Sequence, residues 1–496
     1  MSQSPAAYGR STSRRRPSGP RTGAPVRTGA PSRSGSSGRG GSSGRGGASG
    51  RPASATRTAS SALDAALTEA AALPAPEATS FADLGLPAPL VEALRRRGLL
   101  HPFAIQARTL PDALAGRDVL GRAATGSGKT LAFGLPMLAR LAASSATHSA
   151  RGGALRALVL VPSRELALQV TQNLTPLAGA LGLTVSSVVG GTGYARQIDV
   201  LNRGVDLLVA TPGRLVDLIE RQVCRLDNVE ITALDEADFM ADLGFLPVVT
   251  RLLTMTPSDG QRLLFSATLD RGVAGLVETF LHRPAIHAVA PATATITSMT
   301  HRVFVVDRDD KTQIAAEVAI RPARTLFFVR TKHGADRLAK QLGRAGVDAA
   351  ALHGNLAQNA RQRVMSAFSD GRTRVLVATD VAARGLHVDD VDLVVHFDPP
   401  ADHKDYLHRS GRTARAGNAG TVVSFVQRDQ MTDMRKLHHD VQVEAVVEAV
   451  GPGHEAVRAM GSSGSPVVPK AAAPSSSSSS SGPRTGTGGP RRRRGR

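Results

Sequence analysis

The sequence predicts an α/β protein with two tandem parallel-sheet domains between two basic tails. Short β-branched and apolar runs alternate with helical stretches over most of the chain, which is typical of parallel sheets with helical crossovers. A weakly patterned segment rich in Pro, Ala and Thr (283–300) interrupts this alternation once. The length of 496 residues also favours two or more domains.

The expected strands follow in chain order. In the first domain they are 118–120, 157–161, 206–210, 231–234 and 263–266. After the interruption the alternation restarts, and the expected strands are 325–329, 374–378, 393–396 and 421–425. Two α/β domains joined by a linker follow from this pattern.

The two ends of the chain have a different composition. Residues 1–80 are dominated by Ser, Gly, Arg, Pro and Ala, with too little apolar surface to offset the entropy of ordering. We expect this segment to be disordered, except for one short helix at 61–72. After about Gly461 the same composition returns, with seven consecutive serines and an Arg-rich end. That tail is expected to be disordered as well.

The excess positive charge lies almost wholly in these tails. The chain has 61 Lys and Arg against 41 Asp and Glu, and 18 of the net 20 charges fall in residues 1–60 and 459–496, which contain no acid. Cationic ends on a near-neutral body indicate a polyanionic partner, because Arg neutralises phosphates and releases condensed counterions. The alternative is that the tails only confer solubility.

Cysteine content and hydropathy exclude several classes of protein. A single cysteine, Cys224, excludes an intramolecular disulfide and a cysteine-cluster zinc site, and fits a reducing compartment. We expect no membrane span, because no apolar run reaches about 18 residues, and no signal peptide, because no apolar stretch follows the first basic residues. The cytoplasm is the expected location.

A glycine-rich turn carries the first candidate site. It lies between the expected strand at 118–120 and the apolar run 131–138, and its residues are Thr125, Gly126, Ser127, Gly128, Lys129 and Thr130. Backbone amides of such a turn cradle phosphates together with the helix dipole, while Lys129 reaches the terminal phosphates and Thr130 ligates Mg²⁺. The strict pattern has Gly where this chain has Ala123, so an ordinary strand-to-helix turn is the alternative.

Acidic residues follow the expected strand at 231–234. Asp235 would hold Mg²⁺ through its hydration shell, and Glu236 would orient and deprotonate the attacking water. Taken alone, these acids would also fit a helix N-cap with favourable dipole charges.

The order and spacing of these motifs resemble the DEAD-box ATP-dependent RNA helicases of superfamily 2 over roughly residues 81–430. The resemblance implies two RecA-like domains, ATP and Mg²⁺ as cofactors, and RNA as a partner bound largely independently of sequence. It implies ATP hydrolysis coupled to local RNA unwinding or ribonucleoprotein remodelling. We expect a monomer with these segments: a tail (1–80), the ATP-binding domain (81–285), a linker (286–296), the C-terminal helicase domain (297–430), a partly helical extension (431–461) and a tail (462–496).

The resemblance assigns further residues to ATP. Phe81 and the run 98–106 are similar to the family's adenine-recognising motif, in which Gln106 offers a donor and an acceptor to the base. Gln106 alone would be an ordinary helix-surface residue. In the second domain, Arg412 and Arg415 resemble arginine fingers, which stabilise charge on the transferring phosphate. A basic patch for RNA is the alternative for these arginines.

One position near the ATP ribose departs from the family. Gly385 is followed by Leu and then His387, where the family usually places Asp. His387 either donates to a ribose hydroxyl or faces solvent, and the sequence leaves both open.

Other motifs resemble the elements that grip RNA backbone, where hydroxyls, arginines and exposed amides suit phosphate and sugar rather than base edges. Ser163 replaces the usual Thr in one of them and keeps the hydroxyl. The expected RNA-binding residues are Arg164, Gly191, Thr211, Gly213, Arg214, Gln358, Arg361 and Thr379. Two rival functions are a DNA-directed motor and an RNA chaperone acting through its tails with a vestigial nucleotide site.

Overall fold

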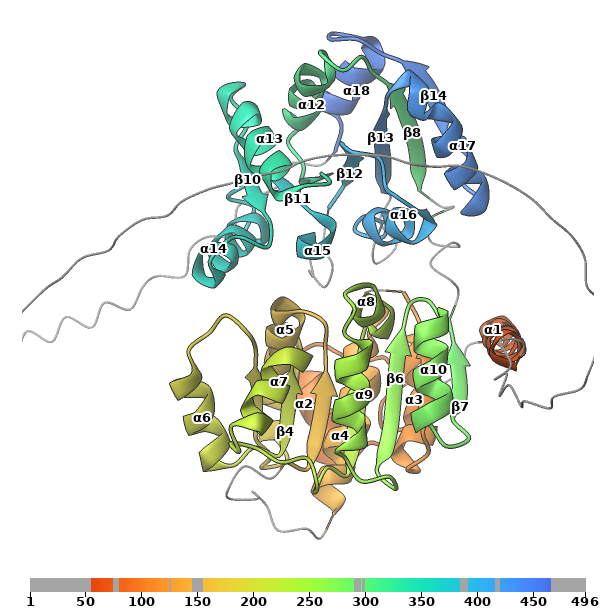
Figure 1. Ribbon diagram of the computed structural model, residues 1–496, viewed down its shortest axis with the longest axis vertical. Helices are drawn as coiled ribbons and strands as arrows, with labels where there is room; N and C mark the ends of the chain where they lie inside the picture. Colours follow the sequence, from red (N-terminus) through yellow and green to blue (C-terminus); the bar gives the residue numbers. More distant parts are fainter. Residues whose placement is uncertain are drawn as a thin grey trace, which may run out of the picture. The chain divides into compact units, whose positions relative to one another are not determined.

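The structure is a computed structural model that describes residues 55–74, 80–124, 126–144, 155–289, 296, 299–383, 391–414 and 420–464. These residues form two seven-stranded sheets in which every described strand pair is parallel, with helices on both faces (Figure 1). The predicted α/β class with two parallel sheets is confirmed. Most of both expected tails lies outside the described residues.

The first sheet has the strand order β3-β4-β2-β5-β6-β1-β7. Its strands are β1 (Val119–Arg122), β2 (Ala157–Leu160), β3 (Val185–Val188), β4 (Leu207–Ala210), β5 (Ile231–Leu234), β6 (Gln261–Ser266) and β7 (Ala285–Ala288). Its helices are α2 (Ala88–Arg96), α3 (Ala104–Leu114), α4 (Lys129–Ala143), α5 (Arg164–Gly179), α6 (Tyr194–Arg203), α7 (Pro212–Glu220), α8 (Ala237–Asp242), α9 (Leu246–Thr254) and α10 (Arg271–Phe280).

The second sheet has the order β10-β11-β9-β12-β13-β8-β14. Its strands are β8 (Thr300–Val305), β9 (Thr325–Phe328), β10 (Ala349–Leu352), β11 (Val375–Ala378), β12 (Leu393–His396), β13 (Thr421–Val426) and β14 (Val446–Ala449). Its helices are α12 (Lys311–Ala319), α13 (Lys332–Arg344), α14 (Gln358–Ser369), α15 (Asp380–Ala383), α16 (His403–Ser410), η1 (Arg428–Gln430), α17 (Met431–Asp440) and α18 (Glu455–Ser462).

Alternation along the central strands builds a core on each face of the first sheet. Val159 and Ala233 pack with residues of α3, α4 and α5, whereas their neighbours Leu158 and Leu234 pack with residues of α7, α9 and α10. All four residues of β2, β4 and β5 are buried, as expected for strands covered on both faces. The carboxyl ends of these strands are therefore held rigidly, which positions the loops that follow them.

The segment before the first sheet contains a longer helix than the sequence predicts. Helix α1 spans Ala55–Ala72, rather than 61–72, and it packs against β7 and α10. Leu67 is fully buried, and its carbonyl accepts a hydrogen bond from Arg122 Nη2 at 3.1 Å. The guanidinium of Arg108 bonds the carbonyls of Ala70 and Leu73 at the end of the helix. Alanine-rich composition favours the helix, and these contacts hold it in place.

Both sheets extend beyond the predicted domain limits. Strand β7 lies inside the segment 283–300 that we expected to be a break, and β14 joins the second sheet beyond residue 430.

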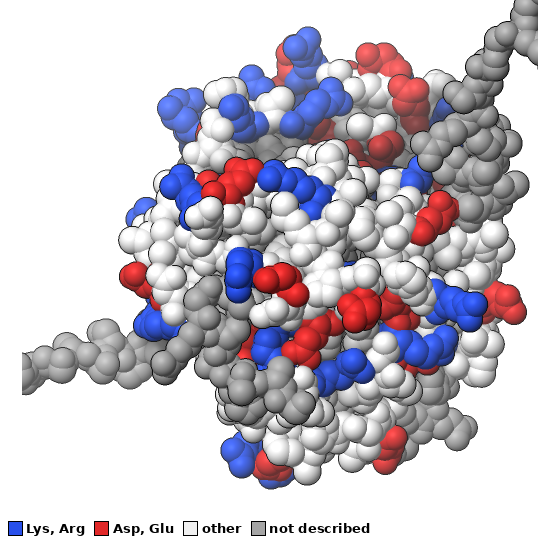
Figure 2. Space-filling model, turned by 60° about the horizontal axis from the view of Figure 1, so that its bottom comes forward, with Lys and Arg blue, Asp and Glu red and all other residues white. Residues whose placement is uncertain are grey.

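Among the residues that the structure describes, no helix is long and apolar enough to cross a membrane. On the face shown in Figure 2, basic and acidic side chains are interspersed, in keeping with a body of low net charge.

Candidate active site and nucleic-acid interface

The glycine-rich turn connects β1 to α4, as the sequence predicts. Gly126 and Gly128 both have φ near 90°, a backbone conformation that side chains disfavour, and a Cβ at Gly128 would overlap the Gln106 amide. Lys129 is buried as the first residue of α4, and its Nζ donates to the carbonyls of Ala123 (3.0 Å) and Ala124 (3.2 Å). Thr125 lies outside the described residues.

Gln106 connects α3 to this turn. Its Oε1 accepts from the Phe103 amide at 2.9 Å, and its Nε2 donates to the Gly128 carbonyl at 3.0 Å. Both polar ends of the buried side chain are therefore oriented by backbone groups. The predicted adenine residue thus lies against the predicted phosphate turn, 22 residues away in sequence.

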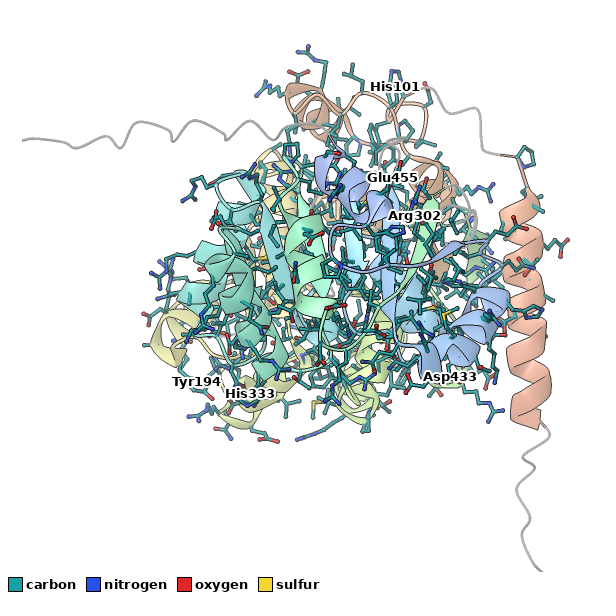
Figure 3. All side chains as sticks on the ribbon, turned by 90° about the horizontal axis from the view of Figure 1, so that it is seen from above. His101, Tyr194, Arg302, His333, Asp433 and Glu455 are labelled. Carbon is teal, nitrogen blue, oxygen red and sulfur yellow. The ribbon has the colours of Figure 1, made fainter. Side chains whose placement is uncertain are left out.

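A cleft of about 300 Å³ brings the predicted ATP residues together. Its walls include residues from α3, the phosphate turn and the end of β5, and this volume is at the lower end of the range for small-molecule sites. The predicted residues that line it are Phe81, Gln106, Gly126, Gly128, Lys129, Thr130, Asp235 and Glu236. His101 (labelled in Figure 3), which belongs to the predicted run 98–106, also lines it. Arg97 and Asn173 line it too, and the sequence analysis did not name them.

Asp235 and Glu236 follow the fully buried strand β5. Asp235 accepts a hydrogen bond from the Glu236 amide at 3.0 Å, and Glu236 adopts the left-handed conformation with φ 53°. Such a conformation is costly for a residue other than glycine and persists only where the surroundings impose it, often at functional sites. Burial raises the pKa of Asp235 to about 7, although the Lys129 cation opposes that rise.

The donor set of the cleft fits Mg²⁺. The Thr130 hydroxyl and the Asp235 carboxylate line the same cleft, and oxygen ligands are those that Mg²⁺ prefers. No group of three or more His, Cys, Asp or Glu suited to a metal occurs among the described residues. A site of few protein oxygens is consistent with an ion held mainly through water and substrate phosphates.

Asp238 links three segments of the chain. Its Oδ2 accepts from the Thr268 amide (2.9 Å) and hydroxyl (3.0 Å), and its own amide donates to Ser266 Oγ at 3.2 Å. The His408 Nε2 atom in α16 lies 3.8 Å from the same carboxylate. Burial alone would raise the pKa of Asp238, but hydrogen bonding to His408 and the positive charges nearby hold it below the usual value. Ser266 and Thr268, which follow each other closely at the end of β6, therefore contact the acidic motif directly.

The arginines that follow α16 are described in part. Arg412 is buried, and its Nε donates to the His408 carbonyl at 3.3 Å. Arg409 was not assigned from the sequence, yet it forms a bidentate pair with Asp380 at 2.5 and 2.8 Å and donates to the Asp398 carbonyl at 2.7 Å. Gly385, His387 and Arg415 lie outside the described residues.

Two predicted RNA-binding arginines of the first domain pack closely on a neighbour: Arg164 on Gly191, and Arg214 on the Tyr194 ring. Gly191 has φ 72°, and a Cβ there would overlap the guanidinium of Arg164. Arg214 lies 4.1 Å from the ring centroid of Tyr194 (Figure 3) and donates to the Thr192 carbonyl at 3.0 Å. The Tyr194 hydroxyl also hydrogen-bonds the Asp217 carboxylate, so Arg214, Tyr194 and Asp217 form one cluster.

The remaining predicted RNA residues either directly follow a strand or lie in helix α7 or α14. Thr211 directly follows β4, and Gly213 is in the first turn of α7; Thr379 directly follows β11. Arg361 Nε lies 2.7 Å from Glu165 Oε1, and Gln358 Nε2 donates to the same atom at 3.2 Å. Glu165, a neighbour of Arg164, is another residue that the sequence analysis did not assign.

The comparisons with known proteins decide the family. Residues 103–276 match the DEAD/DEAH box helicase model, and residues 310–417 match the helicase conserved C-terminal domain model. The DEAD-box ATP-dependent RNA helicase CshA of Geobacillus kaustophilus is 37% identical over 363 residues, which cover 73% of this chain and 76% of that protein. This chain belongs to the DEAD-box helicase family.

Other relatives agree with membership of the DEAD-box family. The ATP-dependent RNA helicase RhlB of Xanthomonas oryzae pv. oryzae is 39% identical over 376 residues, but the match spans only 66% of that protein's length. The structure of S. cerevisiae Dbp5 bound to RNA and ADP BeF3 has a TM-score of 0.68 at 28% identity and covers 77% of this chain and 99% of that one. The predicted tandem RecA-like fold and the resemblance to DEAD-box helicases are confirmed. The roles assigned to single residues stay predictions.

Proposed function

We propose that this DEAD-box protein is an RNA-dependent ATPase that couples Mg²⁺-dependent ATP hydrolysis to local RNA unwinding or ribonucleoprotein remodelling. The observation that carries the proposal is the convergence of Gln106, Lys129, Asp235 and Glu236 on one cleft. The relatives named as ATP-dependent RNA helicases, and the neighbour solved with RNA and a nucleotide, support the same activity.

In the proposed reaction, the cleft binds and orients ATP. The apolar wall and the Gln106 amide receive the base, and the amides of the phosphate turn together with Lys129 receive the terminal phosphates. Thr130 and Asp235 would hold Mg²⁺, which supplies neutralising charge to the phosphates when bound. Glu236 accepts a hydrogen bond from the attacking water and orients it for in-line attack.

The second sheet supplies the remaining charge in this scheme. Arg412 and Arg415 would face the transferring phosphate and stabilise the charge that develops there. Asp238 connects the acidic motif to Thr268 and, across 3.8 Å, to His408, which is four residues before Arg412. The acidic motif, the segment that follows β6 and helix α16 therefore meet at one buried carboxylate, which offers a physical route for coupling between the two sheets.

RNA-stimulated phosphate release tests the proposed function. Full-length protein should release phosphate slowly from ATP alone and much faster with single-stranded RNA, and it should displace a short strand from an RNA duplex. Equal stimulation by DNA of the same sequence would favour a DNA-directed motor. RNA annealing or binding without any RNA-stimulated release would favour a chaperone.

A further inference from the structure

The two sheets of this protein repeat one strand order, so each position in the first sheet has a counterpart in the second. Strands β8 and β12 occupy the places that β1 and β5 hold in the first sheet. The ATP cleft is lined by residues that follow β1 and β5, at the carboxyl ends where parallel α/β sheets bind ligands. The counterpart of that location lies at the carboxyl ends of β8 and β12.

A cavity of about 650 Å³ lies at this counterpart location. It is formed by the start of α12, one face of α13 as far as Gln341, and the segments that follow β8, β9, β12 and β13. Its volume falls within the range of roughly 300–1,000 Å³ that is usual for small-molecule sites. The polar residues used below are Arg308, Lys311, Arg330, Arg337, Asp398 and Gln430.

A lysine and an acid recur at corresponding points of the two sites. Lys311 is the first residue of α12, as Lys129 is of α4. Asp398 is the second residue after β12, the place that Glu236 holds after β5. Lys311 Nζ lies 3.3 Å from Asp398 Oδ1 and 4.4 Å from the ring centroid of Phe397. The second sheet therefore keeps a lysine and an acid at the points that these residue types occupy in the first cleft.

The loop between β8 and α12 differs from the glycine-rich turn. Residues 306–310 contain no glycine and three aspartates, Asp307, Asp309 and Asp310, so this loop does not reproduce an amide cradle for a triphosphate. The side chains that line the cavity supply positive charge in its place: four cations face one carboxylate, that of Asp398. The Asp398 carboxylate is itself engaged by Lys311 and by the Arg330 amide at 2.9 Å.

Electrostatics within the cavity favour an anion. Burial is the main cause that lowers the pKa of Lys311, and the Arg330 cation lowers it further, while Asp398 acts in the opposite direction. An anion placed between these side chains would relieve the repulsion between Lys311 and Arg330. Guanidinium groups such as those of Arg330 and Arg337 match phosphate geometry through paired hydrogen bonds.

We propose that this cavity binds the phosphate of a small phosphorylated molecule of nucleotide size, held by Arg330, Arg337 and Lys311. The site lies beyond the proposed ATPase function and does not depend on it. A small ligand is favoured over RNA because the predicted RNA residues in this part of the chain, Gln358, Arg361 and Thr379, follow β10 and β11, which do not contribute to the cavity. The Gln430 side chain also lines the cavity, and its Oε1 accepts from the Gln427 amide at 3.1 Å.

Calorimetric titration with inorganic pyrophosphate tests the site in the full-length chain. Lys129→Ala removes the main phosphate-binding cation of the first cleft, and this variant should still bind one pyrophosphate per chain. Adding Arg337→Gln should weaken that binding about tenfold, the loss expected for one charge-assisted hydrogen bond. The matched control is Arg344→Gln, an exposed arginine on the same helix that does not line the cavity. It should leave the affinity unchanged.

Chemical modification of the unaltered chain provides a second measurement. Pyrophosphate should protect Arg330 and Arg337, but not Arg344, from phenylglyoxal, as read by mass spectrometry. Three results would overturn the proposal: no pyrophosphate bound by the Lys129→Ala chain, equal effects of the two glutamine substitutions, or no selective protection. Protection by an RNA oligonucleotide but not by pyrophosphate would assign the cavity to the RNA path instead.

Discussion

The loops after β1 and after β8 occupy the same place in two sheets of identical strand order, yet their chemistry differs. The first contains Gly126 and Gly128 in a conformation that favours glycine. The absence of a side chain at Gly128 lets the Gln106 amide lie close to the backbone of the turn. The second contains three aspartates and no glycine over 306–310. The scaffold is thus repeated while the glycine-rich turn is not, which illustrates that function resides in the loops grafted on a fold.

The largest effect should come from replacing Glu236, the proposed general base of the ATP site. If only the loops of the first sheet hydrolyse ATP, Glu236→Gln should lower kcat by roughly 10²–10⁴-fold, because the amide cannot accept a proton from water. Binding of ATP and RNA should be retained. RNA-stimulated phosphate release gives kcat, and the exposed Asp348→Asn in the second sheet is the control. If the variant turned over ATP almost as fast as the unaltered chain, Glu236 would not be the residue that activates water.

The second sheet should matter for catalysis through its arginine. Arg412→Ala should lower kcat by on the order of a hundredfold or more while RNA still binds, since the arginine acts on transition-state charge. Arg412 is buried, so thermal unfolding of the variant should be measured alongside turnover. The exposed Arg435→Ala in α17 serves as the control. Equal turnover of the two variants would remove Arg412 from the catalytic scheme.

Buried histidines should make the folding stability of the second domain depend on pH. Burial lowers the pKa of His438 to about 4, and it lowers the pKa of His301 and of the fully buried His396 beside Tyr406. A histidine whose folded pKa is depressed contributes stability that is present above its unfolded pKa, roughly 6.5, and is lost as pH falls towards the folded value.

For His438 alone this linkage amounts to about 2 kcal/mol of unfolding free energy between pH 7 and pH 5. Unfolding by urea at both pH values measures it. His438→Leu should reduce the pH dependence of the second sheet, whereas substituting the exposed His439 should not. An unchanged pH dependence in His438→Leu would show that this histidine is not the acid-sensitive group.

The tails should affect RNA capture rather than chemistry. A chain limited to residues 55–464 retains α1 and α18 but lacks most of the surplus positive charge. It should keep the turnover seen at saturating RNA while needing roughly tenfold more RNA for half-maximal stimulation. Its logarithmic salt slope should be flatter by about 0.7 for each phosphate that the tails neutralise. Superimposable titrations of both chains at several salt concentrations would leave solubility as the role of the tails.

The smallest effect should come from the aromatic support of Arg214. Tyr194→Leu removes the ring under the guanidinium and should raise the RNA concentration for half-maximal stimulation about fivefold, with kcat unchanged. Tyr194→Phe keeps the ring but loses the hydrogen bond to Asp217, so its effect should be smaller. A leucine variant with unaltered RNA dependence would show that Arg214 does not need this ring.

Local motifs were predictable from the sequence, whereas long-range pairings were not. The turn around Gly128 and the acids after β5 are contiguous and follow a strong apolar strand, so their place in the fold could be read directly. Strands β3 and β10 were missed because Val185–Val188 contains two serines and Ala349–Leu352 is mostly alanine, which lack β-branched runs. Strand β14 was missed because its partner β8 lies more than a hundred residues away.

Ion pairs between residues that are far apart in sequence could not be predicted either. Arg409 and Asp380 are 29 residues apart, and Arg361 and Glu165 belong to different sheets. A single sequence has no periodic signal that joins such positions. Arg412, close to Arg409 in sequence, was nevertheless assigned. Charged residues next to assigned ones, such as Glu165 beside Arg164, were the available clue to their involvement.

The packing of α1 has a practical consequence for any shortened version of this protein. Strand β7 is the outer strand of the first sheet, and α1 lies against it. A chain that started at residue 81, where the sequence alone places the domain, would leave that strand uncovered. Arg108 would lose the carbonyls of Ala70 and Leu73 and keep that of Ala288, and Arg122 would lose the Leu67 carbonyl. Uncovered outer strands template pairing between molecules. Such a chain should self-associate and precipitate at concentrations at which one starting at residue 53 remains dispersed.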